Sequence, residues 1–150
     1  ARRLSDTTTH RMRYVMSESK LISATSGNTP YQVLLNDGLH QWLADEPASL
    51  GGGDNGPNPI SLVLSGLGAC TAITLCMYAK RKAWPLEGVY VELSLGSLGA
   101  GEAGSQITRQ ITLKGPLDDD MRNRLMQIAN ACPVHKLLTQ PIQVHTNAIQ

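Results

Sequence analysis

A long stretch of the chain, from Pro59 to Ala79, contains no charged residue and is nearly long enough to cross a bilayer. Several small and polar residues dilute its hydrophobicity, and it is the only stretch of this kind in the sequence. Its start has the pattern of a capped soluble helix, with Asn58 as N-cap and Pro59 at the first helical position. We therefore interpret the stretch as a helix that is buried on all sides, in a core or a dimer interface, and we expect no membrane span.

The boundaries of this helix follow from its neighbours in the sequence. A Gly-, Asn- and Pro-rich loop precedes it, and Pro85 blocks its continuation. The helix is thus predicted over about 59–83, roughly 36 Å long at 1.5 Å per residue. Three cations close to its end, Lys80, Arg81 and Lys82, complement the helix dipole or simply form a solvated terminus.

Strands are predicted before and after the helix. Residues from about 10 to 45 mix β-forming residues with turn signals at Ser26-Gly27-Asn28 and Asn36-Asp37-Gly38. From Val89 to Leu95 apolar and polar residues alternate, and a second such strand places Arg109 on the apolar face with Ile107, Ile111 and Leu113.

A second helix is expected to begin in the acidic run Asp118 to Asp120, and its apolar stripe includes Cys132. Pro133 stops it and can start a short helix, after which Ile142 to Thr146 resemble a last strand. No linker or repeat interrupts the chain. We predict one α+β domain over 1–150, with a strand-rich part about 10–45, the cysteine helix, and a second αβ half about 87–146.

Charge and cysteine content limit the partners and the compartment. The net charge is +1 without basic clusters, so neither nucleic acid nor an anionic membrane is expected as a partner. Three cysteines are few and odd in number, and the first residues lack the apolar core of a signal peptide. A cytoplasmic protein is the expectation.

The cysteines are the candidates for chemistry. Taken alone, Cys70 is interpreted as a small apolar packing residue of the helix. Cys76 lies about 120° further around the helix axis and is interpreted as structural. Cys132 would be the N-cap of the short helix, where backbone N–H groups favour a thiolate. His135 could add a positive charge or a proton path, or have no role at all.

A metal site would need Cys70, Cys76, Cys132 and His135. The chain has no Cys-x-x-Cys motif, and two of these ligands would leave opposite sides of one helix. We expect no metal and no cofactor.

Several segments together resemble the OsmC/Ohr family, named for osmotically inducible protein C and organic hydroperoxide resistance protein. The segments are Asp45-Glu46-Pro47, Gly51-Gly52, Gly56-Pro57-Asn58-Pro59, Leu67-Gly68-Ala69-Cys70-Thr71, Met77-Tyr78-Ala79, Trp84-Pro85-Leu86, Ile107-Thr108-Arg109 and Cys132-Pro133-Val134-His135. The resemblance covers about Asp45 to Thr146.

This resemblance implies an OsmC-like α+β fold with antiparallel sheets, a long central cysteine-bearing helix, a second cysteine-bearing helix and an intertwined homodimer. It also implies reduction of organic hydroperoxides in oxidative stress defence, with Cys70 as the peroxidatic and Cys132 as the resolving thiol. A thiol reductant such as a dihydrolipoyl group would then restore both thiols.

Two family features have no clear counterpart in this sequence. Catalytic members carry a glutamate just after the Asn-Pro that starts the helix, where this chain has Ile60 and Ser61. They also use an arginine from the N-terminal strands, for which Arg13 is a candidate beside Arg11. Glu46 and Arg109 are candidate substitutes. Two alternatives therefore stay open: a non-catalytic protein that binds a small apolar ligand, and a scaffold with inert cysteines.

Overall fold

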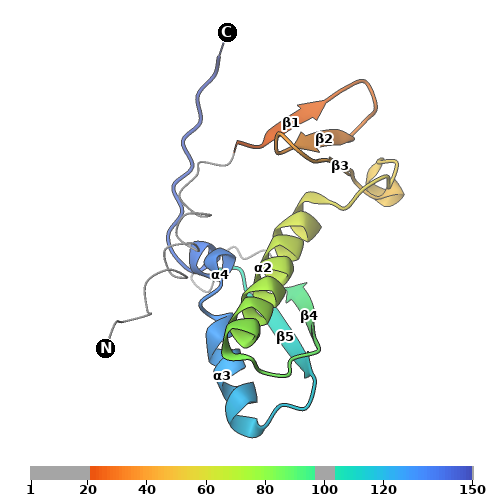
Figure 1. The fold of residues 1–150 in the computed structure, drawn as a ribbon. Coiled ribbons are helices and arrows are strands. Elements are labelled where there is room, and N and C mark those ends of the chain that lie inside the picture. The colour runs from red at the N-terminus through yellow and green to blue at the C-terminus, as the bar shows by residue number, and fades with distance from the viewer. Residues whose placement is uncertain (1–20, 97–103, 150) are drawn as a thin grey trace. The chain divides into compact units, whose positions relative to one another are not determined.

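The computed structural model describes residues 21–96 and 104–149, and the chain forms two compact units. The first unit extends to Leu62 and the second begins at Val63. Figure 1 shows their elements. A single domain over the whole chain stays a prediction.

The first unit contains a three-stranded antiparallel sheet of order β1–β2–β3. Its strands are β1 (Ser23–Ser26), β2 (Val33–Asn36) and β3 (Gln41–Ala44), followed by the 3₁₀ turn η1 (Ala48–Leu50). Both turn signals of the sequence lie at the connections between these strands. The predicted strand-rich region is confirmed from Ser23 onward, whereas its first half lies outside the described residues.

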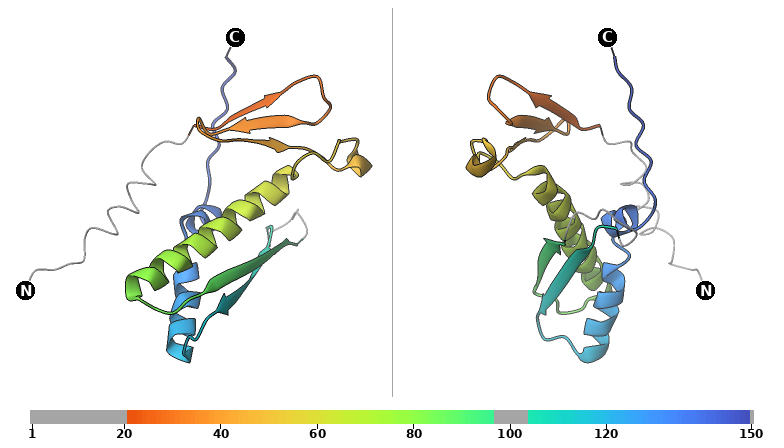
Figure 2. Two further views of the ribbon diagram at one scale, coloured as in Figure 1. Left: turned by 45° about the vertical axis from the view of Figure 1, so that its right-hand side comes forward. Right: turned by 180° about the vertical axis from the view of Figure 1, so that it is seen from behind.

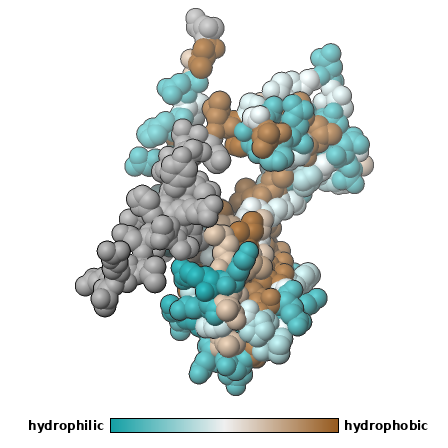
Figure 3. All heavy atoms as spheres, viewed as in Figure 1, coloured by the Kyte–Doolittle hydropathy of each residue, from teal (hydrophilic) through white to brown (hydrophobic). Residues whose placement is uncertain are grey.

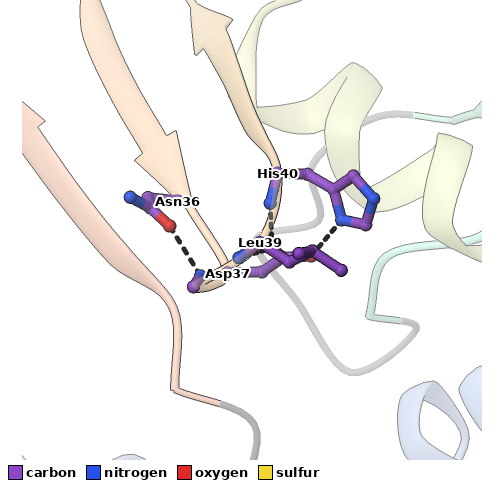
Figure 4. Close-up of polar contacts among 5 residues, drawn as sticks. Asn36, Asp37, Leu39 and His40 are labelled. Atoms are coloured by element: carbon purple, nitrogen blue, oxygen red, sulfur yellow. Dashed lines mark hydrogen bonds and ion pairs between the residues drawn. The ribbon is translucent and has the colours of Figure 1, made fainter.

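The β2–β3 turn is held by two side chains (Figure 4). The Asp37 carboxylate accepts hydrogen bonds from the backbone N–H of His40 at 2.6 Å and of Leu39 at 2.9 Å, and Asn36 Oδ1 accepts from Gly38 N–H at 2.6 Å. These bonds lower the pKa of Asp37 to about 2, the bond from His40 N–H contributing most. Gly38 has φ of 91°, a conformation that favours glycine.

The loop after β3 is organised around the buried carboxylate of Asp45. Its oxygens accept backbone N–H bonds from Glu46 at 2.8 Å, Asn55 at 3.1 Å and Gly53 at 3.4 Å. The bond from Asn55, followed by that from Glu46, holds the pKa of Asp45 below its ordinary value. The loop therefore has a defined path to the start of the long helix.

The second unit packs helices against a β-hairpin. Its elements are α2 (Pro59–Lys82), which begins in the first unit, β4 (Gly88–Leu95), β5 (Ile107–Lys114), α3 (Asp119–Ala129) and α4 (Pro133–Leu138). The strands β4 and β5 pair antiparallel, and α2 lies beside them in both views of Figure 2. The buried core joins both helices to the connection between β5 and α3 through Leu75, Ala79, Leu117, Leu125 and Ala129.

Leu125 is expected to contribute strongly to this core because it is completely buried on α3. The substitution Leu125→Ala should lower the free energy of unfolding by about 2–5 kcal/mol through lost burial and a residual cavity. Chemical denaturation monitored by circular dichroism measures the change. The adjacent Met126 is 45% exposed, so Met126→Ala is the matched control and should change stability far less. Equal effects of the two substitutions would contradict this description of the core.

The α2 helix was expected to be buried on all sides, in a core or a dimer interface. Within the described residues of one chain it is buried on one face only, and burial of the other face in a dimer stays a prediction. Its buried residues are Leu67, Thr71, Thr74, Leu75 and Ala79. The opposite face is exposed and uncharged, and carries Ser65, Gly66, Ala69, Ile73, Cys76 and Met77. Hydrophobic residues reach the surface along the course of α2 in Figure 3. Cys76 therefore lies on an exposed face and not in a core.

Length and composition alone would allow α2 to cross a membrane. Its most apolar window has a mean hydropathy of 2.0, and 22% of that window is buried. A core helix of a soluble protein passes the same test, so one such helix is weak evidence for a span.

Two other expectations need correction. The segment Ile142 to Thr146 is extended but forms no strand, because no other described strand pairs with it. Cys132 does not belong to the second helix, because α3 ends at Ala129 and Asn130 caps it.

Candidate thiol site

Two elements of the second unit position the cysteines. Cys70 lies in the middle of α2 and is partly exposed. Cys132 lies between α3 and α4, is completely buried, and is the N-cap of α4. The predicted N-cap position of Cys132 is confirmed.

The two thiols are neighbours although they are far apart in the sequence. Burial raises the pKa of the Cys70 thiol, and its hydrogen bond with the Cys132 thiol raises this pKa further. Two groups act in the opposite direction: the backbone N–H of Val134 and the side chain of Thr74. The net pKa of Cys70 lies above its ordinary value, so at rest the thiol is protonated at neutral pH.

The first turn of α4 supplies hydrogen-bond donors to both sulfurs. Pro133 occupies its first position and has no N–H, so the first available donors belong to Val134 and His135. The His135 N–H donates to Cys132 Sγ at 3.5 Å, and the Val134 N–H is directed to Cys70. One turn of backbone thus contacts both thiols.

His135 is partly buried beside the site. Burial lowers the pKa of its imidazole, and the positive charge of Arg109 lowers it further. The ring is therefore neutral at pH 7, which favours a role as proton acceptor over a role as fixed positive charge.

Arg109 lies on the inward face of β5, as the strand alternation predicts. Its Nη1 donates to Thr71 Oγ1 at 2.9 Å and to the Ala129 carbonyl at 3.3 Å, and its Nη2 donates to Asn130 Oδ1 at 2.9 Å. Arg109 is not among the principal causes of the pKa shift of Cys70. Its contacts are with residues that flank the two cysteines.

Glu46 and Arg13 were the remaining candidates for this site. Glu46 belongs to the first unit, which the structure does not place relative to Cys70. Arg13 lies outside the described residues. A role for either in activating Cys70 stays a prediction.

The second unit also contains a pocket of about 280 Å³. Its wall combines apolar and polar side chains: Leu67, Ile107, Leu138, Ser105, Arg109, His135 and Thr139. Arg109 and His135 therefore contact both the pocket and the thiol region.

Sequence reasoning missed Thr74 and the Val134 N–H. Thr74 is four positions after Cys70 on a helix, so the i, i+4 spacing could have identified it. The Val134 donor could not be found this way, because its approach to Cys70 depends on tertiary packing. In the described part of the chain, no group of three or more His, Cys, Asp or Glu residues could hold a metal ion.

The ionisation of Cys70 gives a direct test of this geometry. In a Cys76→Ser background, the alkylation rate of Cys70 by iodoacetamide should keep rising with pH beyond 9, because its pKa is raised above the ordinary 9.0. Cys132→Ala should move the midpoint to lower pH, because it removes the thiol that raises this pKa. Site-resolved mass spectrometry measures both rates. An unchanged midpoint in Cys132→Ala would show that the thiols do not interact.

Comparison with known proteins places the chain in a family. Residues 51–147 match the family model described as OsmC-like protein, which is more than half of the sequence. The chain therefore belongs to the OsmC-like family. No curated protein matches the sequence.

Solved structures share this fold at low identity. An OsmC-like protein from Mycoplasma pneumoniae has a TM-score of 0.70 and 19% identity, over 82% of this chain and 89% of that chain. The organic hydroperoxide resistance protein OsmC from Legionella pneumophila has a TM-score of 0.59 and 23% identity, over 82% of this chain and 90% of that chain. The organic hydroperoxide resistance protein OhrB of Bacillus subtilis has a TM-score of 0.56 and 22% identity, over 81% of this chain and 91% of that chain. These likenesses confirm the predicted α+β fold with antiparallel sheets and a long helix.

Proposed function

We propose that this protein is a cysteine-based peroxidase that reduces organic hydroperoxides in oxidative stress defence. The observation that carries the proposal is the contact between the thiols of Cys70 and Cys132, which come from distant parts of the chain. Membership of the OsmC-like family supports it, as do the names of the Legionella and Bacillus proteins.

In the first step, the Cys70 thiolate attacks the distal oxygen of the hydroperoxide. The O–O bond breaks, the alkoxide leaves and takes up a proton to become an alcohol, and Cys70 becomes a sulfenic acid. Cys70 suits this role because it is partly exposed. We propose that the neutral imidazole of His135, which belongs to the same short helix α4 as the backbone N–H donors to the sulfurs, accepts the thiol proton.

In the second step, the Cys132 sulfur attacks the sulfenic sulfur, an S–S bond forms, and the hydroxyl leaves as water. Cys132 suits the resolving role because it is completely buried, where a hydroperoxide has no access. A dithiol reductant, such as a dihydrolipoyl group, then donates two electrons and restores both thiols.

We further propose that the protein acts as a homodimer in the cytoplasm. The uncharged exposed face of α2 is the argument for the dimer, because Ile73 is 59% and Met77 48% exposed on a helix that has no charge before Lys80. The argument for the cytoplasm is that all three cysteines are free thiols. Neither nucleic acid nor a membrane is part of the proposed function.

Stopped-flow mixing of the reduced protein with cumene hydroperoxide tests the activity. We expect hydroperoxide consumption well above the free-thiol rate and formation of one Cys70–Cys132 disulfide, identified by peptide mapping. Oxidation at the rate of free cysteine, without this disulfide, would refute the peroxidase.

The pocket of about 280 Å³ favours one alternative, a non-catalytic protein that binds a small apolar ligand. Native mass spectrometry of protein purified from cells distinguishes the two. A co-purified ligand together with slow peroxide turnover would support the alternative, whereas an unloaded protein with fast turnover would exclude it.

A further inference from the structure

Arg109 joins the two chain segments that carry the thiols. It lies on β5 opposite Leu93 of β4, and its guanidinium reaches both α2 and the end of α3. On α2 it contacts Thr71, the residue after Cys70. At the end of α3 it contacts Ala129 and Asn130, just before Cys132.

The acceptors of these three bonds are themselves held in place. Thr71 is completely buried, and its hydroxyl donates to the Leu67 carbonyl at 2.7 Å. Asn130 is the C-cap of α3, and its N–H bonds back to Gln127 and Ile128. The Ala129 carbonyl belongs to the last turn of α3, where carbonyls lack intrahelical partners. A planar guanidinium can satisfy several such acceptors at once from fixed directions.

Formation of a disulfide needs this kind of restraint. The bond requires Cα atoms about 4.4–6.8 Å apart and a narrow range of torsion angles. Displacement of a reacting group by about 1 Å can slow a reaction by about a hundredfold. Arg109 bonds to Thr71, next to Cys70, and to Ala129 and Asn130, just before Cys132, so its contacts can set the relative geometry of the two cysteine segments.

We propose that Arg109 is a positioning residue for the resolving step, which holds the Cys70 segment of α2 against the Cys132 segment so that the two sulfurs can bond. This proposal rests on the proposed function. It assigns Arg109 to disulfide formation and not to the attack on hydroperoxide. Loss of the guanidinium should therefore extend the lifetime of the sulfenic acid on Cys70.

A single-turnover experiment measures this effect. Reduced protein is mixed with one equivalent of cumene hydroperoxide in the presence of dimedone, which traps sulfenic acid, and the disulfide and the dimedone adduct are quantified by mass spectrometry. For Arg109→Gln and Arg109→Lys we expect Cys70 oxidation within about twofold of wild type, and disulfide formation slower by about ten- to a hundredfold. Lysine should not rescue disulfide formation, because one ammonium group cannot reproduce the several N–H donors that the planar guanidinium holds in fixed directions.

Two further variants complete the series. Asn130→Ala removes one of the three hydrogen bonds and leaves Arg109 in place. It should therefore raise the fraction of Cys70 trapped by dimedone less than the arginine variants do. It also keeps the test valid if the arginine variants fold poorly. Arg124→Gln is the matched control, because its guanidinium contacts Tyr78 and Gln127 and neither cysteine segment. Arg124→Gln should give the same ratio of disulfide to dimedone adduct as the wild-type protein.

The reduction potential of the Cys70–Cys132 pair gives a readout that needs no peroxidase activity. In a glutathione redox buffer, a tenfold lower effective concentration of the two thiols raises the potential by about 30 mV. We expect at least this shift in Arg109→Gln and none in Arg124→Gln. Three results would overturn the proposal. The first is a folded Arg109→Gln variant with an unchanged reduction potential and an unchanged ratio of disulfide to dimedone adduct. The others are full rescue by Arg109→Lys and a defect confined to the KM for hydroperoxide. Slow oxidation of wild-type Cys70 would refute the proposed function instead, and the potential would still decide the role of Arg109.

Discussion

Replacing Cys70 with serine is expected to lower the rate of hydroperoxide reduction by roughly a thousandfold or more, to the uncatalysed level. The reason is that the hydroxyl cannot accept the distal oxygen as a sulfenic acid, and no other described thiol is both exposed and beside Cys132. Stopped-flow measurement of hydroperoxide consumption gives the rate. Cys132→Ser should behave differently: the first turnover proceeds, a sulfenic acid accumulates on Cys70, and no intramolecular disulfide forms.

Cys76→Ser is the matched control for both variants. Cys76 lies on the same helix six positions later, but on the exposed face away from the thiol pair. Its replacement should leave both oxidation and disulfide formation unchanged. If Cys70→Ser retains the wild-type rate, or if Cys76→Ser loses it, the assignment of the peroxidatic thiol is wrong.

Introducing a charge on the exposed face of α2 is expected to separate the proposed dimer. Ile73→Glu would place a carboxylate in an apolar contact, which costs about 3 kcal/mol or more and weakens association by roughly a hundredfold. Sedimentation velocity over a range of concentrations measures the change in the monomer–dimer equilibrium. Because Ile73 is exposed within the chain, the second unit should keep its fold, as circular dichroism can confirm.

Met126→Glu is the control for this substitution. Met126 is exposed to a similar degree, but on α3. It should leave the dimer intact. A wild-type protein that sediments as a monomer at all concentrations, or equal effects of the two charges, would show that α2 is not the interface.

Much of the local structure could be predicted because its signals lie in neighbouring residues. Asn58 and Pro59 mark the start of α2, and Pro85 excludes its continuation, so the predicted end differs from the observed one by a single residue. Asp118 caps α3, its side chain accepting from the Met121 N–H, as the acidic run suggested. The turn signals at the ends of β1 and β2 were equally local.

The errors concern features that depend on what packs against a segment. The apolar pattern of Ile142 to Thr146 suits a strand, but a strand must also pair with a neighbouring strand. The residues of the segment alone do not determine whether such a strand is present. The apolar stripe of the second helix extends as far as Cys132, yet the helix ends at Ala129, and the chain turns so that Cys132 can cap α4.

For the candidate site, the sequence could name candidate residues but could not predict their interactions. The resemblance to the OsmC/Ohr family pointed to Cys70 and Cys132, and the strand alternation placed Arg109 on the inward face. Nothing in the spacing showed that Arg109 would bond to Thr71 and Asn130, or that the Val134 N–H would approach Cys70.

The sequence by itself determined the helix ends, the turns and the alternation of the strands, because each depends on the conformational preferences of a few consecutive residues. Only the tertiary structure decided that the thiol of Cys132 raises the pKa of Cys70 and that one guanidinium links their segments. A pKa and a hydrogen bond depend on distances through space, and packing sets these distances between residues that are far apart along the chain.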